Sequence, residues 1–209
     1  MRNIIVTVAR QYGSGGKTVA GMYAKKNGVP CYGRDILRMA SDASGISETL
    51  FGQVDEKLKN GSLFGISKKI YRGELLPPSS DEFTSPQNLF NYQAKVIRDL
   101  ADKGPCAFVG RCADFVLTDR TNVVSVFVHA PKDYCLEQAR LRNSMSTAEL
   151  EKFIAKTDKF RGDFYRYYTG REWNDARNYD LCLDSSKLGF DKCVEAIEAY
   201  INVRFKELG

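Results

Sequence analysis

The feature that most constrains the fold is a short apolar segment followed by a glycine-rich loop and then a helix. Residues 4–9, IIVTVA, are mostly β-branched and have too few polar positions for a half-exposed strand. Residues 13–18, GSGGKT, follow, and Val19, Met22 and Tyr23 then recur at helical spacing. Glycines permit a tight turn whose backbone N–H groups, at the start of a helix, attract anions. This stretch predicts a buried parallel strand leading into a phosphate-binding loop.

Strands and helices alternate along the rest of the chain. Further strands are expected at residues 29–32, 108–109, 122–129 and 179–183. Helices are expected at residues 34–43, 86–103, after Pro131, after the capping box of Ser146 and Glu149, and over residues 190–208. This alternation predicts a three-layer α/β/α fold with a five-stranded parallel sheet, in which ligands bind at the carboxyl ends of the strands.

The domain organisation follows from length and local composition. The chain has 209 residues, 43% of them hydrophobic, which suits one domain with a substantial core. Residues 60–86 are rich in Gly, Pro and Ser and show weak periodicity. We therefore expect a single domain with a mobile insertion over about residues 44–86 that covers the site.

Composition argues against several classes of site. The six cysteines are scattered without a CxxC pair, and His129 is the only histidine, so we expect no disulfide framework, zinc site or histidine triad. The chain lacks an apolar run of the ~18 residues that a bilayer span needs, and its first residues lack the features of a secretory signal. These observations predict a cytoplasmic protein that does not enter membranes.

Many of the arginines are concentrated in a few segments of the sequence rather than distributed evenly along it. The net charge is only +5, and six arginines lie between residues 140 and 177. Arginines concentrated in a few segments favour a small phosphorylated ligand over a nucleic acid polymer.

The glycine-rich loop has two possible registers. The pattern GxxxxGK[ST] is satisfied by Gly16-Lys17-Thr18 but requires glycine where the chain has Gln11. If Gly13-Ser14-Gly15 is instead aligned with loops of the GSGK type, Gly16 takes the lysine position and Lys17 lies one residue beyond it. Backbone N–H groups at the helix start bind an anion in either register.

Motifs in order along the chain carry a resemblance to a known family. They are Arg10-Gln11-Tyr12-Gly13-Ser14-Gly15-Gly16, Gly110-Arg111-Cys112-Ala113-Asp114, the segment 126–131, Asp158-Lys159-Phe160-Arg161 running into Tyr167-Tyr168, Trp173-Asn174-Asp175, and Tyr179-Asp180-Leu181. Together they resemble the cytidylate kinase-like family of P-loop kinases over nearly the whole chain. The sequence departs from that family at Gly33, where an aspartate is usual.

The resemblance implies transfer of a phosphoryl group from ATP, with Mg²⁺, to a nucleoside monophosphate such as CMP or to another small phosphorylated acceptor. Gly13, Ser14, Gly15, Gly16, Lys17 and Thr18 would hold the donor phosphates, with the Thr18 hydroxyl on Mg²⁺. The acceptor would be held by Arg34, Arg38, Arg111 and Asp114. The catalytic residues would be Lys17, Arg161 and Arg166, of which the arginines lie on an expected helical lid over about residues 158–175.

Two functions from different classes stay open at this stage. One is the nucleotide kinase. The other is a nucleotide-binding regulatory protein of the same fold with little turnover, which the displaced Lys17 and the missing carboxylate at Gly33 favour. Whether the protein is a monomer or a homo-oligomer also stays open.

Overall fold

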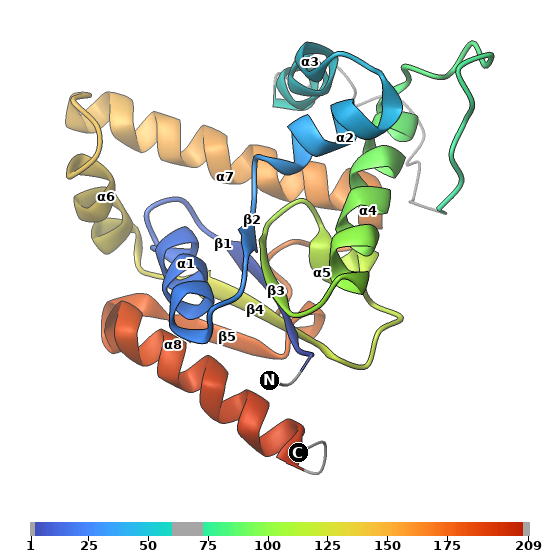
Figure 1. The fold of residues 1–209 in the computed structure, drawn as a ribbon. Coiled ribbons are helices and arrows are strands. Elements are labelled where there is room, and N and C mark those ends of the chain that lie inside the picture. The colour runs from blue at the N-terminus through green and yellow to red at the C-terminus, as the bar shows by residue number, and fades with distance from the viewer. Residues whose placement is uncertain (1–2, 60–72, 207–209) are drawn as a thin grey trace.

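The computed structural model describes residues 3–59 and 73–206, which form a three-layer α/β/α fold (Figure 1). Within these residues the sheet has five strands in the order β2-β3-β1-β4-β5, and every neighbouring pair is parallel. The strands are β1 (Ile5–Arg10), β2 (Cys31–Tyr32), β3 (Cys106–Val109), β4 (Val123–His129) and β5 (Leu181–Asp184). The predicted five-stranded parallel sheet is confirmed.

The described helices surround this sheet. They are α1 (Gly16–Asn27), α2 (Ile36–Ser44), α3 (Glu48–Lys59), α4 (Pro86–Asp102), α5 (Ala113–Val116), α6 (Lys132–Arg140), α7 (Thr147–Thr169) and α8 (Ser185–Arg204), with a 3₁₀ turn at Ala176–Asn178. No helix in this part of the chain is long and apolar enough to cross a bilayer.

Side chains of β1 alternate between two hydrophobic layers. Val6 points to one face, where it packs with Val19 of α1 and Ile197 of α8. Ile5 points to the other face, in the layer that contains Phe90 of α4 together with residues of α2, α3 and α7. Because both faces of β1 are covered, its sequence is almost uniformly apolar rather than alternating.

Helix α7 passes above the carboxyl ends of the strands, and α3 packs against it (Figure 1). The predicted capping box is present: Ser146 accepts a hydrogen bond from the backbone of Glu149, whose side chain bonds back to Ser146. The helix ends at Gly170, which adopts the left-handed conformation. Residues 158–169 of the predicted lid therefore belong to one continuous helix, whereas closure of the lid stays a prediction.

The expected insertion contains more regular structure than its sequence indicates. Residues 48–59 form α3, and Phe51 is fully buried in the layer beneath it. Residues 60–72 lie outside the described part of the chain. Residues 73–85 run alongside α4 and are hydrogen-bonded to it by Asn88 and Asn91.

Asn88 is the main tether of this segment. It is fully buried; its Oδ1 accepts from the backbone N–H of Leu76 at 2.9 Å, and its Nδ2 donates to the carbonyl oxygen of Phe83 at 2.7 Å. We expect Asn88→Ala to lower the free energy of unfolding by about 2–4 kcal/mol, because buried backbone groups lose their partners. Urea unfolding of this variant, with exposed Lys95→Ala as control, checks the value, and a change below about 0.5 kcal/mol would contradict it.

Candidate active site

The loop between β1 and α1 has a fixed shape. Gly13 and Gly15 both have positive φ angles, 83° and 77°, which favour glycine. The Ser14 side chain is buried, and its hydroxyl lies 2.9 Å from the carbonyl oxygens of both Gln11 and Val128. A Cβ atom added at Gly13 would lie 2.2 Å from the carbonyl oxygen of Cys135, so α6 packs directly on the loop.

The loop leads into α1, whose N-terminus has no side-chain cap. Gly15, the N-cap of α1, offers no side-chain hydrogen bond, and the first turn holds no acidic residue. Ser85, Ser146 and Asp184 cap α4, α7 and α8 with their side chains, whereas α2, α5 and α6, like α1, have no side-chain cap. The first N–H groups of α1 have no acceptor within the helix and carry its positive dipole end. This cradle suits the phosphates of a nucleotide.

The packing around Gly16 bears on the two registers of the loop. Helix α1 begins at Gly16, and a Cβ atom there would lie only 2.4 Å from Cβ of Arg10 and 3.2 Å from Cβ of Val128. Position 16, which takes the lysine in the GSGK alignment, thus has no room for a side chain. Lys17 is exposed and does not line the adjacent cleft. Its charge instead acts on Cys31 of β2, where it opposes the rise in thiol pKa that burial causes.

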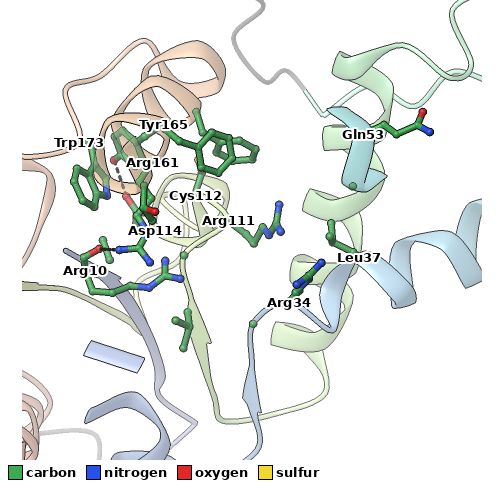
Figure 2. A pocket seen from close by; sticks show the side chains of 18 of the residues that line it. Arg10, Arg34, Leu37, Gln53, Arg111, Cys112, Asp114, Arg161, Tyr165 and Trp173 are labelled. Atoms are coloured by element: carbon green, nitrogen blue, oxygen red, sulfur yellow. Dashed lines mark hydrogen bonds between the residues drawn. The ribbon is translucent and has the colours of Figure 1, made fainter. Parts of the chain in front are cut away.

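A cleft of about 800 Å³ opens beside the loop at the carboxyl ends of β1 and β3. Residues from α2, α3, the β3–α5 connection and α7 complete its walls (Figure 2). Its lining includes four arginines, Arg10, Arg34, Arg111 and Arg161, and two carboxylates, Glu48 and Asp114. The excess of guanidinium groups favours an anionic ligand.

Arg161 joins α7 to the end of β1. Its Nη1 donates to the carbonyl oxygen of Arg10 and to Oδ1 of Asp158, at 3.0 Å each. The same Asp158 oxygen accepts from the backbone N–H of Tyr12 at 2.7 Å. Burial raises the pKa of Asp158, and Arg161 is the largest influence opposing that rise. The predicted lid residue Arg161 therefore lies in the cleft and is bound to the last residue of β1.

Arg10 is a site residue that sequence reasoning did not assign a role. It is the last residue of β1, and its guanidinium lies so close to Gly110 that a Cβ atom there would be 2.4 Å from Nη1. Burial, followed by the charges of Arg161 and Arg111, lowers the pKa of Arg10 to about 9, and Asp158 opposes them. The side chain stays cationic at neutral pH.

Arg111 is held in the cleft by an unusual backbone. Arg111 and Cys112 have positive φ angles of 59° and 53°, directly after Gly110 at 73°. Such conformations are costly for residues with a side chain and concentrate at functional sites. The guanidinium lies 5.8 Å from the ring centroid of Phe164, and its Nη1 is 3.5 Å from Oε1 of Gln93. The predicted acceptor residue Arg111 thus projects into the cleft (Figure 2).

The other residues predicted to hold the acceptor are separated by the structure. Arg34 lines the cleft from the segment just before α2, whereas Arg38, within α2, does not line it, and both residues are exposed. Gly33 also lines the cleft, and Asp35, which follows it, directs Oδ1 to the Gly33 N–H at 2.6 Å. A carboxylate therefore lies next to the position where the family usually has one, although Asp35 itself does not line the cleft.

Arg166 is not brought to the cleft. It is exposed on α7, where its Nε donates to Oε1 of Glu172 at 2.7 Å and its Nη1 lies 4.0 Å from Oδ1 of Asp163. It does not line the cleft that holds Arg161. This placement speaks against the predicted catalytic role of Arg166, because a surface ion pair explains its position.

The residues near the loop suit a magnesium nucleotide. Thr18 is the third residue of α1, and its hydroxyl lies 3.4 Å from Nη2 of Arg142. Across the described ranges, no group of three or more His, Cys, Asp or Glu side chains is placed to hold a metal. Mg²⁺ bound to a nucleotide needs no such cage, because phosphate oxygens, waters and one or two protein oxygens fill its coordination. The Thr18 hydroxyl is the candidate protein ligand.

Asp114 contributes a partly buried carboxyl to the cleft wall. Its Oδ2 accepts a hydrogen bond from the Tyr165 hydroxyl at 2.6 Å. Burial raises the pKa of Asp114, and this hydrogen bond is the largest opposing influence.

The raised pKa of Asp114 predicts a pH-dependent contribution to stability. The folded state binds the proton more tightly than the unfolded chain, whose pKa is about 4, so stability is greatest below that pH and is lost as pH rises through the raised pKa. Asp114→Asn keeps an acceptor for Tyr165. We expect its unfolding free energy to match the wild type below about pH 4 and to exceed it increasingly at higher pH. Denaturant unfolding at a series of pH values tests this, and a constant difference would contradict it.

Comparison with known proteins agrees with this geometry. The sequence profile described as the cytidylate kinase-like family matches residues 5–187. A search of curated proteins gives no match. A crystal structure described as an uncharacterized protein from Eubacterium ventriosum is 24% identical, with a TM-score of 0.70 over 95% of this chain and 98% of that one.

Two solved kinases share the fold at lower similarity. Shikimate kinase from Bacteroides thetaiotaomicron is 12% identical with a TM-score of 0.54, over 95% of this chain and 98% of that chain. A sugar kinase from a Janibacter species is 15% identical with a TM-score of 0.50, over 96% and 95%. Since the family match covers most of the chain and the fold agrees with it, this protein belongs to the cytidylate kinase-like family and has a P-loop kinase fold.

Proposed function

We propose that the protein transfers a phosphoryl group from ATP to a small acceptor that already carries a phosphate, with CMP or another nucleoside monophosphate as the first candidate. The observation that carries this proposal is the meeting of two anion-binding features. The uncapped N-terminus of α1 lies beside a cleft lined by four arginines. One feature suits the donor phosphates and the other suits a second anion.

Phosphoryl transfer asks a protein mainly for positioning and for cations around the migrating group. The amides of the loop from Gly13 to Thr18 would hold the donor phosphates, and Mg²⁺ held there by Thr18 would neutralise part of their charge. Arg111 and Arg34 would grip the phosphate of the acceptor from the far side of the cleft. Arg161 would stabilise charge on the transferred group, since it lines the cleft and bridges α7 and the end of β1.

The remaining wall of the cleft supports an acceptor with an aromatic base. Phe160, Phe164, Tyr165 and Trp173 line it, together with Thr157 and the carboxyl of Asp114. Thr157 Oγ1 is buried, with no hydrogen-bond partner among the described residues. Aromatic side chains offer flat surfaces for a base, while Asp114 and Thr157 offer polar atoms that distinguish one base from another.

A regulatory protein that binds nucleotide without turnover is the second candidate. It is favoured by the exposed position of Lys17, since a P-loop lysine normally reaches the β and γ phosphates. In this case ATP would bind the loop and no acceptor would stimulate release of ADP.

One assay separates the two candidates. The purified protein is incubated with Mg-ATP and, separately, with each nucleoside monophosphate and a set of phosphorylated sugars, and formation of ADP is followed. We expect ADP formation that depends on one phosphorylated acceptor and falls at least about 10²-fold in Arg111→Ala. ATP binding without acceptor-dependent ADP would contradict the kinase and support the regulatory protein.

A further inference from the structure

Lys17 does not line the cleft, so a phosphoryl group inside the cleft would meet other cations. Position 16 is closed by the stem of Arg10, whose Cβ is 2.4 Å from where a Cβ of Gly16 would lie. Lys17 is exposed and acts on Cys31 of β2. The side chain that closes the lysine position is itself a cation.

Arg10 spans the distance between the two anion-binding features. Its stem passes Gly16, the first residue of α1, and its head ends against Gly110, at the start of the connection that carries Arg111. Figure 2 shows the guanidinium of Arg10 at the base of the cleft, between the end of β1 and Arg111. A group transferred from the helix N-terminus into the cleft would pass this guanidinium.

The surroundings of Arg10 leave its charge uncompensated. The side chain is partly buried, and the neighbouring Arg161 and Arg111 repel it while Asp158 attracts it. The Oδ1 atom of Asp158 already accepts from Tyr12 and Arg161. Among the described residues, no hydrogen-bond acceptor for the guanidinium of Arg10 is found. A partly buried cation without a protein acceptor favours a ligand that supplies the anion.

We propose that Arg10 replaces the loop lysine as the cation that contacts the transferred phosphoryl group, and that the side chain of Lys17 is dispensable for this contact. The inference rests on the proposed function, because it assigns a residue to the same transfer. An arginine at this place offers several N–H donors in a planar fork, so it can bind oxygens of the transferred group in two directions. The glycine at position 16 then has a physical reason, since any side chain there would displace Arg10.

The test compares Arg10→Met, Arg10→Lys and Lys17→Met, with Lys25→Met on the exposed part of α1 as the matched control. We expect Arg10→Met to lower kcat/KM about 10³-fold, and Arg10→Lys to restore part of that loss. The decrease in kcat/KM caused by Lys17→Met is expected to be at least about tenfold smaller than the decrease caused by Arg10→Met. Calorimetry should show Mg-ATP bound at least about tenfold more weakly by Arg10→Met than by the wild type.

The midpoint of thermal unfolding distinguishes a structural role of Arg10 from a role in nucleotide binding. Removing a partly buried charge with like-charged neighbours should leave the midpoint of Arg10→Met unchanged or raise it. A lowered midpoint together with normal affinity for Mg-ATP would overturn the inference. A larger loss in Lys17→Met than in Arg10→Met, in a wild-type protein that turns over ATP, would overturn it and leave the proposed function standing. A wild-type protein that neither binds nor turns over Mg-ATP would overturn both.

Discussion

Arg161→Met is expected to lower kcat/KM about 10³-fold, the scale on which an arginine acts on a transferred phosphoryl group. The side chain is only 19% exposed, lines the cleft, and donates to the carbonyl oxygen of Arg10 and to Asp158. Its loss would remove a cation from the cleft and one of the links between α7 and the end of β1. Steady-state kinetics with the identified acceptor measure this effect.

Arg166→Met is the matched control for Arg161→Met. Both residues lie on α7 and both are candidates by sequence, but Arg166 is exposed and paired with Glu172. We expect less than about threefold change in kcat/KM, in line with the small contribution of surface ion pairs. Because Arg161→Met also leaves Asp158 with one partner fewer, the double variant Arg161→Met/Asp158→Asn separates lost catalysis from an unpaired carboxylate. Equal losses in the two single variants would contradict the site.

Gly13→Ala is expected to disable the loop and to destabilise the protein. An added methyl group would lie 2.2 Å from a backbone oxygen of α6, which cannot move aside as a flexible side chain would. The strained backbone at a φ angle of 83° costs about 1–3 kcal/mol, and overpacking costs a similar amount. Displacement of the loop amides by about 1 Å would lower activity about 10²-fold. Urea unfolding and Mg-ATP calorimetry measure the two effects.

Gly21→Ala is the control for Gly13→Ala. Gly21 lies in the middle of α1, and nothing is within 4 Å of an added Cβ atom. Alanine should stabilise the helix by about 1 kcal/mol and leave nucleotide affinity unchanged. If Gly13→Ala bound Mg-ATP as tightly as Gly21→Ala does, the loop would not be the donor site.

Local sequence patterns were sufficient for the central strands β1 and β4, because each of them carries its own apolar run. The observed β1 and β4 agree with the predicted segments within one residue at each end, and Ser146 caps α7 as its spacing with Glu149 indicates. Helix α3 could not be predicted in this way. It contains Gly52 and several charged residues, and it is stabilised where Phe51 packs into the core. Tertiary packing of this kind overrides weak helical propensity.

The candidate site was predicted less completely than the fold, because side-chain direction depends on distant contacts. Arg161 and Arg166 are five residues apart, which places them about 140° apart around a helix, so only one of them faces the cleft. The spacing of these two arginines could have been used to predict this difference from the sequence alone. The position of the Arg10 side chain could not be predicted in this way, because it packs against Gly110, which lies 100 residues later in the chain.

The central claim is that free amides of the loop before α1 hold the donor phosphates. Amide ¹H–¹⁵N spectra of the protein, titrated with Mg-ATP and separately with adenosine, test it directly. We expect the resonances of Gly13, Gly15 and Gly16 to shift with Mg-ATP and to stay in place with adenosine, because the shift reports a phosphate at the helix N-terminus. Loop resonances that stay unchanged while Mg-ATP shifts amides elsewhere would contradict the account.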